Sequence, residues 1–242
     1  MHYASEHTNR FLLANFSTHI TGSTVISAAL GTALLTAKII NLPESFLLIL
    51  IGALSGLLPD LDADDSTSIG WLFSILAFVT AGSFLAIYPL KSLLGIWMSV
   101  GLIFFAIWFI VKPLFEAITV HRGSLHSLLA TLMFSLLGGI ISIELHTTLN
   151  FALLVSVFIA VGAITHLILD ECYSVDLSNT RLKSSFGSAM KIIDIRFPTA
   201  VTIQSLITAG ASYYLYQHAQ QAVIIVAEWQ SKLSQLSLMP SL

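Results

Sequence analysis

The stretch NFALLVSVFIAVGAITHLILD occupies residues 150–170 and decides the fold class of the chain. It contains no charged residue before Asp170, and its length matches the ~20 apolar residues that an α-helix needs to cross ~30 Å of hydrocarbon. His166 and Asp170 stand four positions apart near its end, so a helix would place both side chains on one face. The stretch therefore predicts a membrane-spanning helix that carries polar chemistry at one end.

The whole chain has the composition of a membrane protein. Of its 242 residues, 56% are hydrophobic and 10% are charged, whereas soluble domains are about 45–50% apolar even when Gly is counted. Helices and closed barrels are the structures that span lipid, and the alternation typical of a barrel is not visible. We therefore predict an all-α, polytopic helical bundle in the lipid bilayer, with six or seven transmembrane helices. They would lie in the nearly charge-free runs 23–40, 46–58, 70–88, 93–111, 125–143, 150–169 and 200–216.

The domain organisation follows from these runs. Residues 1–18 form a polar lead, 19–220 a single transmembrane helical domain, and 221–242 a C-terminal tail. The net charge of −3 gives no reason to expect a nucleic-acid partner. Because Cys172 is the single cysteine, a disulfide within the chain is excluded.

Acidic residues gather directly after the run 46–58. Asp60 and Asp62 belong to a segment with four carboxylates in six residues. Crowded carboxylates beside hydrocarbon repel one another, which favours a bound divalent cation. The simpler alternative is an acidic loop that marks the membrane boundary.

The segment 121–127, HRGSLHS, places two imidazoles and a guanidinium beside a run of apolar residues. A helix that begins near Ser124 would put His126 in its first turn and His121 in the preceding loop, so that both can converge on one centre. The planar guanidinium of Arg122 suits phosphate or carboxylate. Its alternative role is that of a cation extending to the membrane interface.

Counting membrane crossings from the N-terminus places all the polar clusters on one face. The first run begins at His19, the second ends at Asp60, the fifth follows His126, and the sixth ends at Asp170. Seven of the ten Lys and Arg residues lie on this same face, which the positive-inside rule makes cytoplasmic. The polar motifs are therefore predicted to meet at helix ends on the cytoplasmic side.

A mixed set of imidazoles and carboxylates suits Zn²⁺, with Mn²⁺ or Fe²⁺ as alternatives. The set is larger than one tetrahedral shell, so either two ions bind or some residues activate water. The predicted metal ligands are His19, Asp60, Asp62, His121, His126, His166 and Asp170. The predicted catalytic residues are Arg122, Asp62 and His126.

Taken in order, these motifs resemble those of the YdjM-type family, over roughly residues 15–200. The elements that carry the resemblance are His19, Pro59-Asp60-Leu61-Asp62, His121-Arg122-Gly123-Ser124-Leu125-His126-Ser127 and His166-Leu167-Ile168-Leu169-Asp170. Proteins of that family are described as metal-dependent hydrolases of the bacterial inner membrane, and some are regulated by LexA. The resemblance implies an inner-membrane hydrolase with a His/Asp metal centre.

These observations predict a membrane-bound, metal-dependent hydrolase that uses metal-activated water. A site at the membrane interface suits an amphiphilic substrate, such as a phosphoester of a lipid or lipid-linked molecule. The alternative is a membrane metal or ion transporter, or a metal-binding protein without catalysis. Transport favours polar groups near the middle of the spans, whereas here they gather at helix ends.

Overall fold

The computed structural model describes residues 16–62, 67–118, 124–176, 181–182 and 190–236. These residues are helical or lie in connections, apart from a short antiparallel pair of strands, β1 (Val175–Asp176) and β2 (Arg181–Leu182). The prediction of an all-α membrane protein is confirmed. The chain forms two compact units, residues 1–59 with 126–242, and residues 60–125. Whether residues 19–220 act as one domain stays a prediction.

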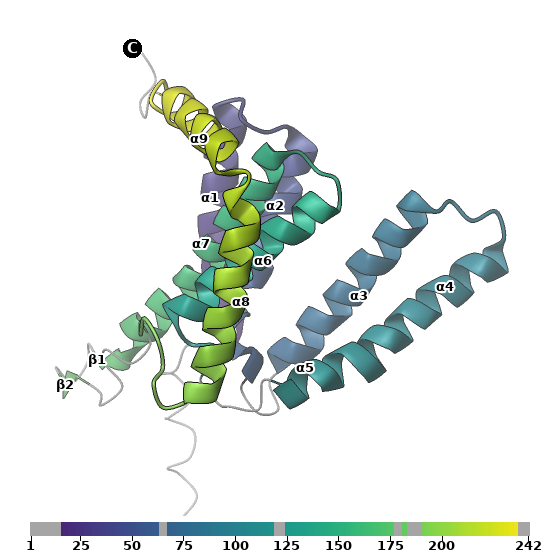
Figure 1. Ribbon diagram of the computed structural model, residues 1–242, viewed down its shortest axis with the longest axis horizontal. Coiled ribbons are helices and arrows are strands. Elements are labelled where there is room, and N and C mark those ends of the chain that lie inside the picture. Colours follow the sequence, from purple (N-terminus) through teal and green to yellow (C-terminus); the bar gives the residue numbers. More distant parts are fainter. Residues whose placement is uncertain (1–15, 63–66, 119–123, 177–180, 183–189, 237–242) are drawn as a thin grey trace, which may run out of the picture. The chain divides into compact units, whose positions relative to one another are not determined.

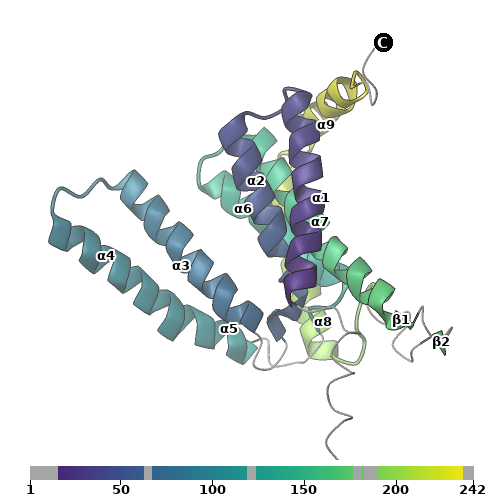
Figure 2. The same ribbon diagram turned by 180° about the vertical axis from the view of Figure 1, so that it is seen from behind.

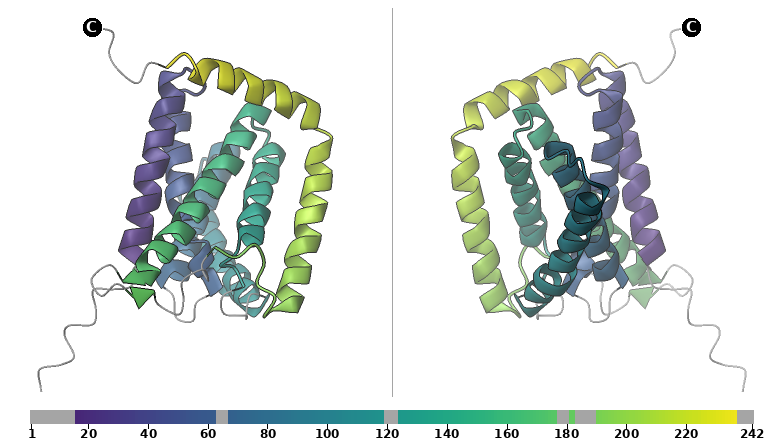
Figure 3. Two further views of the ribbon diagram at one scale, coloured as in Figure 1. Left: turned by 90° about the vertical axis from the view of Figure 1, so that its left-hand side faces the viewer. Right: turned by 90° about the vertical axis from the view of Figure 1, so that its right-hand side faces the viewer.

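The first unit consists of two helical hairpins and two further helices (Figures 1 and 2). α1 packs against α2, α6 against α7, and α7 also contacts both α1 and α2, while α8 lies along α6. Figure 3 shows α9 crossing the end of this unit at which α8 ends. The helices are α1 (Phe16–Thr36), α2 (Leu42–Ser55), α6 (Leu128–Glu144), α7 (Leu149–Ser174), α8 (Pro198–Tyr216) and α9 (Ala219–Leu233).

The turn between α1 and α2 is set by residues that favour helix ends. Lys38 has a positive φ of 56°, which reverses the chain after α1. Asn41 then caps α2 in a reciprocal arrangement: its side chain accepts from the Glu44 backbone N–H, and the Glu44 carboxylate accepts from the Asn41 N–H. Pro43 lies in the first turn of α2, where its missing N–H costs nothing.

The hydrophobic core of the first unit lies where α1, α2 and α7 meet. Trp229 and Leu233 of α9 pack against it, and the Trp229 indole N–H donates to the Asn150 side chain at 2.7 Å. α9 is thereby held against α7. The buried core residues are Leu34, Ile40, Leu48, Phe151, Leu154, Val155 and Phe158.

Small residues let the same three helices approach more closely toward their other end. A Cβ on Gly162 of α7 would collide with the carbonyl oxygen of Gly52 on α2. A Cβ on Gly56 would collide with the hydroxyl of Ser23 on α1, and that hydroxyl donates to the Gly162 carbonyl at 3.2 Å. Close packing of small residues is the usual means of association for helices in lipid, and here it fixes the positions of α1, α2 and α7.

The second unit contains the hairpin of α3 (Thr67–Ile87) and α4 (Leu93–Ala106), drawn in Figure 2. α4 continues through a π-helical turn, η2 (Ile107–Val111), into α5 (Lys112–Ile118). The predicted span 93–111 stops just before Lys112-Pro113, but the helix continues, and the Lys112 N–H donates to the Ile107 carbonyl. This wider turn accommodates Pro113, which has no N–H of its own, so the helix continues.

Within the part of the chain that the structure describes, three helices are long and apolar enough to span a membrane: Ser17–Thr36, Leu93–Phe115 and Leu149–Tyr173. Shorter apolar helices are Leu42–Ser55, Ile69–Gly82 and Leu128–Glu144. Large apolar side chains such as Trp97 and Leu102 of α4 are exposed, as expected for a surface that faces lipid rather than water.

Candidate metal centre

Two of the predicted ligands lie on α7, one helical turn apart. The Nε2 atom of His166 is 3.2 Å from Oδ2 of Asp170. The His166 side chain is fully buried, and its Nδ1 atom lies 2.6 Å from the carbonyl oxygen of Gly56. Because a carbonyl oxygen accepts but cannot donate, Nδ1 carries the proton and Nε2 faces the carboxylate.

α1 brings His19 to the same carboxylate. Its Nε2 atom is 3.2 Å from Oδ1 of Asp170, and its ring stacks on that of His166 with the centroids 3.7 Å apart. The imidazole is buried, and among the described residues its Nδ1 atom has no hydrogen-bond partner. The close contact between α1 and α7 at Ser23 and Gly162 holds the two rings together.

His126 reaches Asp170 from the segment that precedes α6. Its Nε2 atom is 3.6 Å from Oδ2, and its side chain is 24% exposed, about as much as that of Asp170 at 26%, whereas His19 and His166 are buried. The helix begins at Leu128 rather than near Ser124, because Ser127 is its N-cap and accepts from the Ala130 N–H at 3.1 Å. His126 is therefore outside the helix, not in its first turn as expected.

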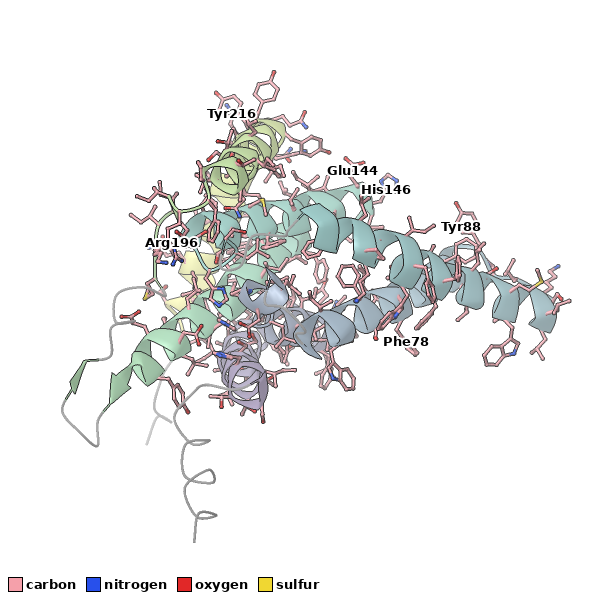
Figure 4. The ribbon with its side chains drawn as sticks, turned by 90° about the horizontal axis from the view of Figure 1, so that it is seen from below. Phe78, Tyr88, Glu144, His146, Arg196 and Tyr216 are labelled. Carbon is pink, nitrogen blue, oxygen red and sulfur yellow. The ribbon has the colours of Figure 1, made fainter. Side chains whose placement is uncertain are left out.

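The three histidines and the aspartate meet at one end of the first unit. α1 and α6 begin there, whereas α2 and α7 end there. Alternation of helix direction thus brings together residues that are far apart in sequence. Glu144 and His146 lie at the other end of the α6–α7 hairpin, where Glu144 pairs with the Tyr214 hydroxyl (Figure 4).

Three imidazole Nε2 atoms around a single carboxylate are chemically suited to a metal ion. A nitrogen lone pair facing a carboxylate oxygen is repulsive unless a proton or a cation lies between them. Two ligand atoms that are each ~2.0 Å from a tetrahedral Zn²⁺ are about 3.3 Å apart, close to the 3.2, 3.6 and 3.2 Å found here. The ligand atoms of His19, His166 and Asp170 lie within 4.8 Å of one another, so these residues could hold a metal ion.

The other predicted site residues lie in two further segments of the chain, residues 59–62 and residues 121–122. Asp60 and Asp62 lie in a short 3₁₀ helix, η1 (Pro59–Asp62), where the second unit begins. His121 and Arg122 lie outside the described residues. Conversely, sequence reasoning missed the Gly56 carbonyl, since a backbone acceptor has no side chain to mark it. The nearest signal is the spacing of Gly52 and Gly56 at the end of α2.

The family model described as YdjM inner membrane protein matches residues 15–229, which include all four clustered residues. The chain belongs to this family. The resemblance drawn from the motifs is confirmed, and so is the inner-membrane location, because the YdjM description agrees with the apolar helices. No curated protein and no solved structure matches the chain.

Proposed function

We propose that this YdjM protein is a metal-dependent hydrolase of the inner membrane. The observation that carries the proposal is the convergence of three imidazole Nε2 atoms on the Asp170 carboxylate, at separations of 3.2–3.6 Å. Three neutral nitrogen donors and one carboxylate form a donor set that Zn²⁺ prefers, with Mn²⁺ and Fe²⁺ as alternatives.

The proposed ligands of the first ion are His19, His126, His166 and Asp170. The Gly56 carbonyl orients His166 so that Nε2 points into the cluster. His121, Asp60 and Asp62 remain proposed ligands of a second ion or groups that activate water.

The proposed reaction is the hydrolysis of a phosphoester. A metal ion held by these residues would supply hydroxide at neutral pH by lowering the pKa of water toward ~7. In the proposed hydrolysis, a water oxygen would form the new bond to phosphorus while the bond to the leaving alcohol breaks. Asp62 is the proposed base for the water proton, the alcohol oxygen takes up a proton on leaving, and Arg122 is proposed to bind the phosphate oxygens.

The location of the cluster supports an amphiphilic substrate. The four residues gather at the ends of apolar helices, where a lipid headgroup and its acyl chains meet different environments. The proposed topology has six or seven spans, made from α1, α2, α3, α4 with its continuation, α6, α7 and α8, and places the cluster on the cytoplasmic side. A position at helix ends favours hydrolysis over transport, for which a site near mid-membrane is expected.

Metal analysis of the purified protein tests the metal centre. We expect wild type to bind one or two divalent ions. His166→Ala and Asp170→Ala should each lower the metal affinity at least about tenfold, because even a residue that only hydrogen-bonds to a metal ligand changes metal affinity by about 10–100-fold. His146→Asn is the matched control, because His146 lies at the far end and its positive φ suits Asn. Unchanged metal content in both Ala variants would overturn the proposal.

The reaction is tested separately from metal binding. Wild type and Arg122→Ala are incubated with phosphomonoester and phosphodiester lipids in mixed micelles, with metal or with chelator. Metal-dependent release of phosphate or alcohol, reduced in Arg122→Ala, is the expected result. If the protein binds metal but hydrolyses neither lipid class, the proposed hydrolase activity is refuted and the alternative of a metal-binding protein without catalysis stands.

A further inference from the structure

The segment Met190–Phe197, here called the strap, lies against the start of α6. The backbone N–H groups of Leu128 and Leu129 donate to the carbonyl oxygens of Lys191 and Ile192, at 2.8 and 3.0 Å. The first N–H groups of a helix have no partner within the helix. At α6 the strap supplies partners for two of them, and the Ser127 side chain supplies one for the third.

An ion-pair cluster around the buried Asp194 side chain holds the strap in shape. The Asp194 side chain is buried, and its carboxylate accepts from Arg196 Nε at 2.8 Å and from Lys191 Nζ at 3.1 Å. The Arg196 backbone N–H donates to the same carboxylate at 3.2 Å. Arg196 is largely exposed, but the Asp194 carboxylate is buried and depends on these partners to compensate its charge. Asp194 therefore fixes Lys191, whose carbonyl binds α6.

His126 depends on this arrangement more than the other members of the cluster do. His19, His166 and Asp170 lie within helices that pack closely on one another, whereas His126 lies before α6, two positions from Leu128. The direction in which its ring points is set by the conformation at the start of α6. Two of the groups that fix this start belong to the strap.

We propose that the strap positions His126 at the metal centre, with Asp194 as its main positioning residue. This inference rests on the proposed metal centre and adds to it a structural element that binds no metal itself. The strap leads directly into α8 (Figure 4 shows Arg196 on this loop). Because α8 packs along α6, the strap is attached to the bundle at both ends, which suits it to hold a ligand in place.

The same contacts exclude a different role for this helix end. An open helix N-terminus binds anions through its free N–H groups and its dipole. Here the first N–H groups already donate to Lys191, Ile192 and Ser127. A phosphate group at this end would have to displace the strap, so side chains are the better candidates for binding an anion.

The test is a double-mutant cycle on metal affinity, with Co²⁺ as a probe whose visible spectrum reports its ligands. We expect Asp194→Asn to lower Co²⁺ affinity by about tenfold. This is the lower end of the loss in metal affinity that follows mutation of residues that position a metal ligand. On a His126→Ala background the same substitution should have little further effect, since residues that act through one another are not additive. On a His19→Ala background its full effect should persist. If the losses of Co²⁺ affinity from Asp194→Asn and His126→Ala add fully in the double variant, the proposal is overturned.

A second measurement does not need the metal. In metal-free protein with ¹⁵N-labelled histidine, Asp194→Asn should shift or broaden the His126 ring signals and leave those of His19 and His166 in place. The control is Lys232→Gln, which breaks the surface pair of Lys232 and Glu228 on α9 and should change nothing. An unchanged His126 signal in folded Asp194→Asn protein would refute the strap's role, whether or not wild type binds metal.

Milder variants cover the case in which Asp194→Asn does not fold. Arg196→Gln leaves Asp194 with Lys191 as its partner, and Arg196→Lys keeps the charge but loses the paired hydrogen bonds. We expect wild type to bind Co²⁺ most tightly, Arg196→Lys less tightly, and Arg196→Gln most weakly. Equal Co²⁺ affinities in all three proteins would contradict the role of the strap. If wild type does not bind Co²⁺ at all, the proposed metal centre is refuted instead.

Discussion

The Nδ1 atom of His166 lies 2.6 Å from the carbonyl oxygen of Gly56, so the end of α2 sets the orientation of a ring on α7. Gly56 itself has no room for a side chain, because Ser23 of α1 occupies the space that a Cβ would fill. A packing detail in the membrane thus decides which nitrogen of His166 faces Asp170.

Gly56→Ala should therefore weaken metal binding without touching a ligand. The new methyl group collides with Ser23, displaces the Gly56 carbonyl, and is expected to lower metal affinity by about tenfold, as for other partners of a metal-bound histidine. Isothermal titration with Zn²⁺ measures the effect. Gly210→Ala on α8 is the matched control, since a Cβ there meets nothing and should be neutral or stabilising by up to about 1 kcal/mol.

A compensating pair sharpens this prediction. Combining Gly56→Ala with Ser23→Gly transfers the side chain from one helix to the other and reopens the space. We expect the pair to recover most of the metal affinity. If the double variant binds as weakly as Gly56→Ala alone, the collision with Ser23 is not the cause.

Added metal should stabilise the folded protein, and the effect should depend on Asp170. A ligand at 100 times its dissociation constant stabilises the native state by about 2.7 kcal/mol. Wild type is expected to unfold at higher temperature with Zn²⁺ than with chelator, whereas Asp170→Asn should unfold at the same temperature in both. Thermal unfolding in detergent, followed by circular dichroism, measures the difference. An equal response of wild type and variant would argue against binding at this cluster.

The strap should make part of the stability depend on pH. Hydrogen bonds from the Arg196 guanidinium, with Lys191 beside it, hold the pKa of the Asp194 carboxyl well below its usual range. A carboxyl whose pKa is lowered in the folded state stabilises the protein above its unfolded pKa of about 3.9, and this contribution is lost as the pH falls further. The difference in melting temperature between wild type and Asp194→Asn should be constant from pH 7 to 5 and decrease below about pH 4.

The hydrogen bond between Trp229 and Asn150 should hold α9 against the core. Trp229→Phe keeps an aromatic ring but removes the donor, and is expected to cost about 1 kcal/mol, as for a typical internal hydrogen bond. Urea unfolding measures this cost. Asn150→Ala should have a similar effect, and the double variant should lose little more than either single one. Independent, additive losses would show that the two side chains do not act together.

Much of the cluster could be predicted because its signals are local or periodic. The four-residue spacing of His166 and Asp170 on a helix is visible in the sequence, and counting crossings places His19 and His126 at the same end. Hydropathy predicts the helices because lipid favours apolar side chains. α8 has less apolar character, and it is not among the helices long and apolar enough to span by themselves.

The rest depends on contacts that leave no mark on a single residue. The Gly56 carbonyl and the carbonyls of Lys191 and Ile192 act through the backbone, which every residue has. The helix start at Leu128 is decided by the cap at Ser127 and by the strap, which lies far along the chain. Pro113 suggested the end of a helix, but a π-helical turn accommodates it.

The close backbone contact between Gly52 and Gly162 has a consequence for biosynthesis. The proposed ligands begin with His19 on the first helix and end with Asp170 on α7, and the Gly52–Gly162 contact requires α7 to be inserted beside α2. A ribosome must therefore have released all of α7 into the bilayer before the cluster exists. If the proposed metal centre binds an ion, the early spans alone would lack a complete site, and metal loading would be a late event that marks a fully inserted chain.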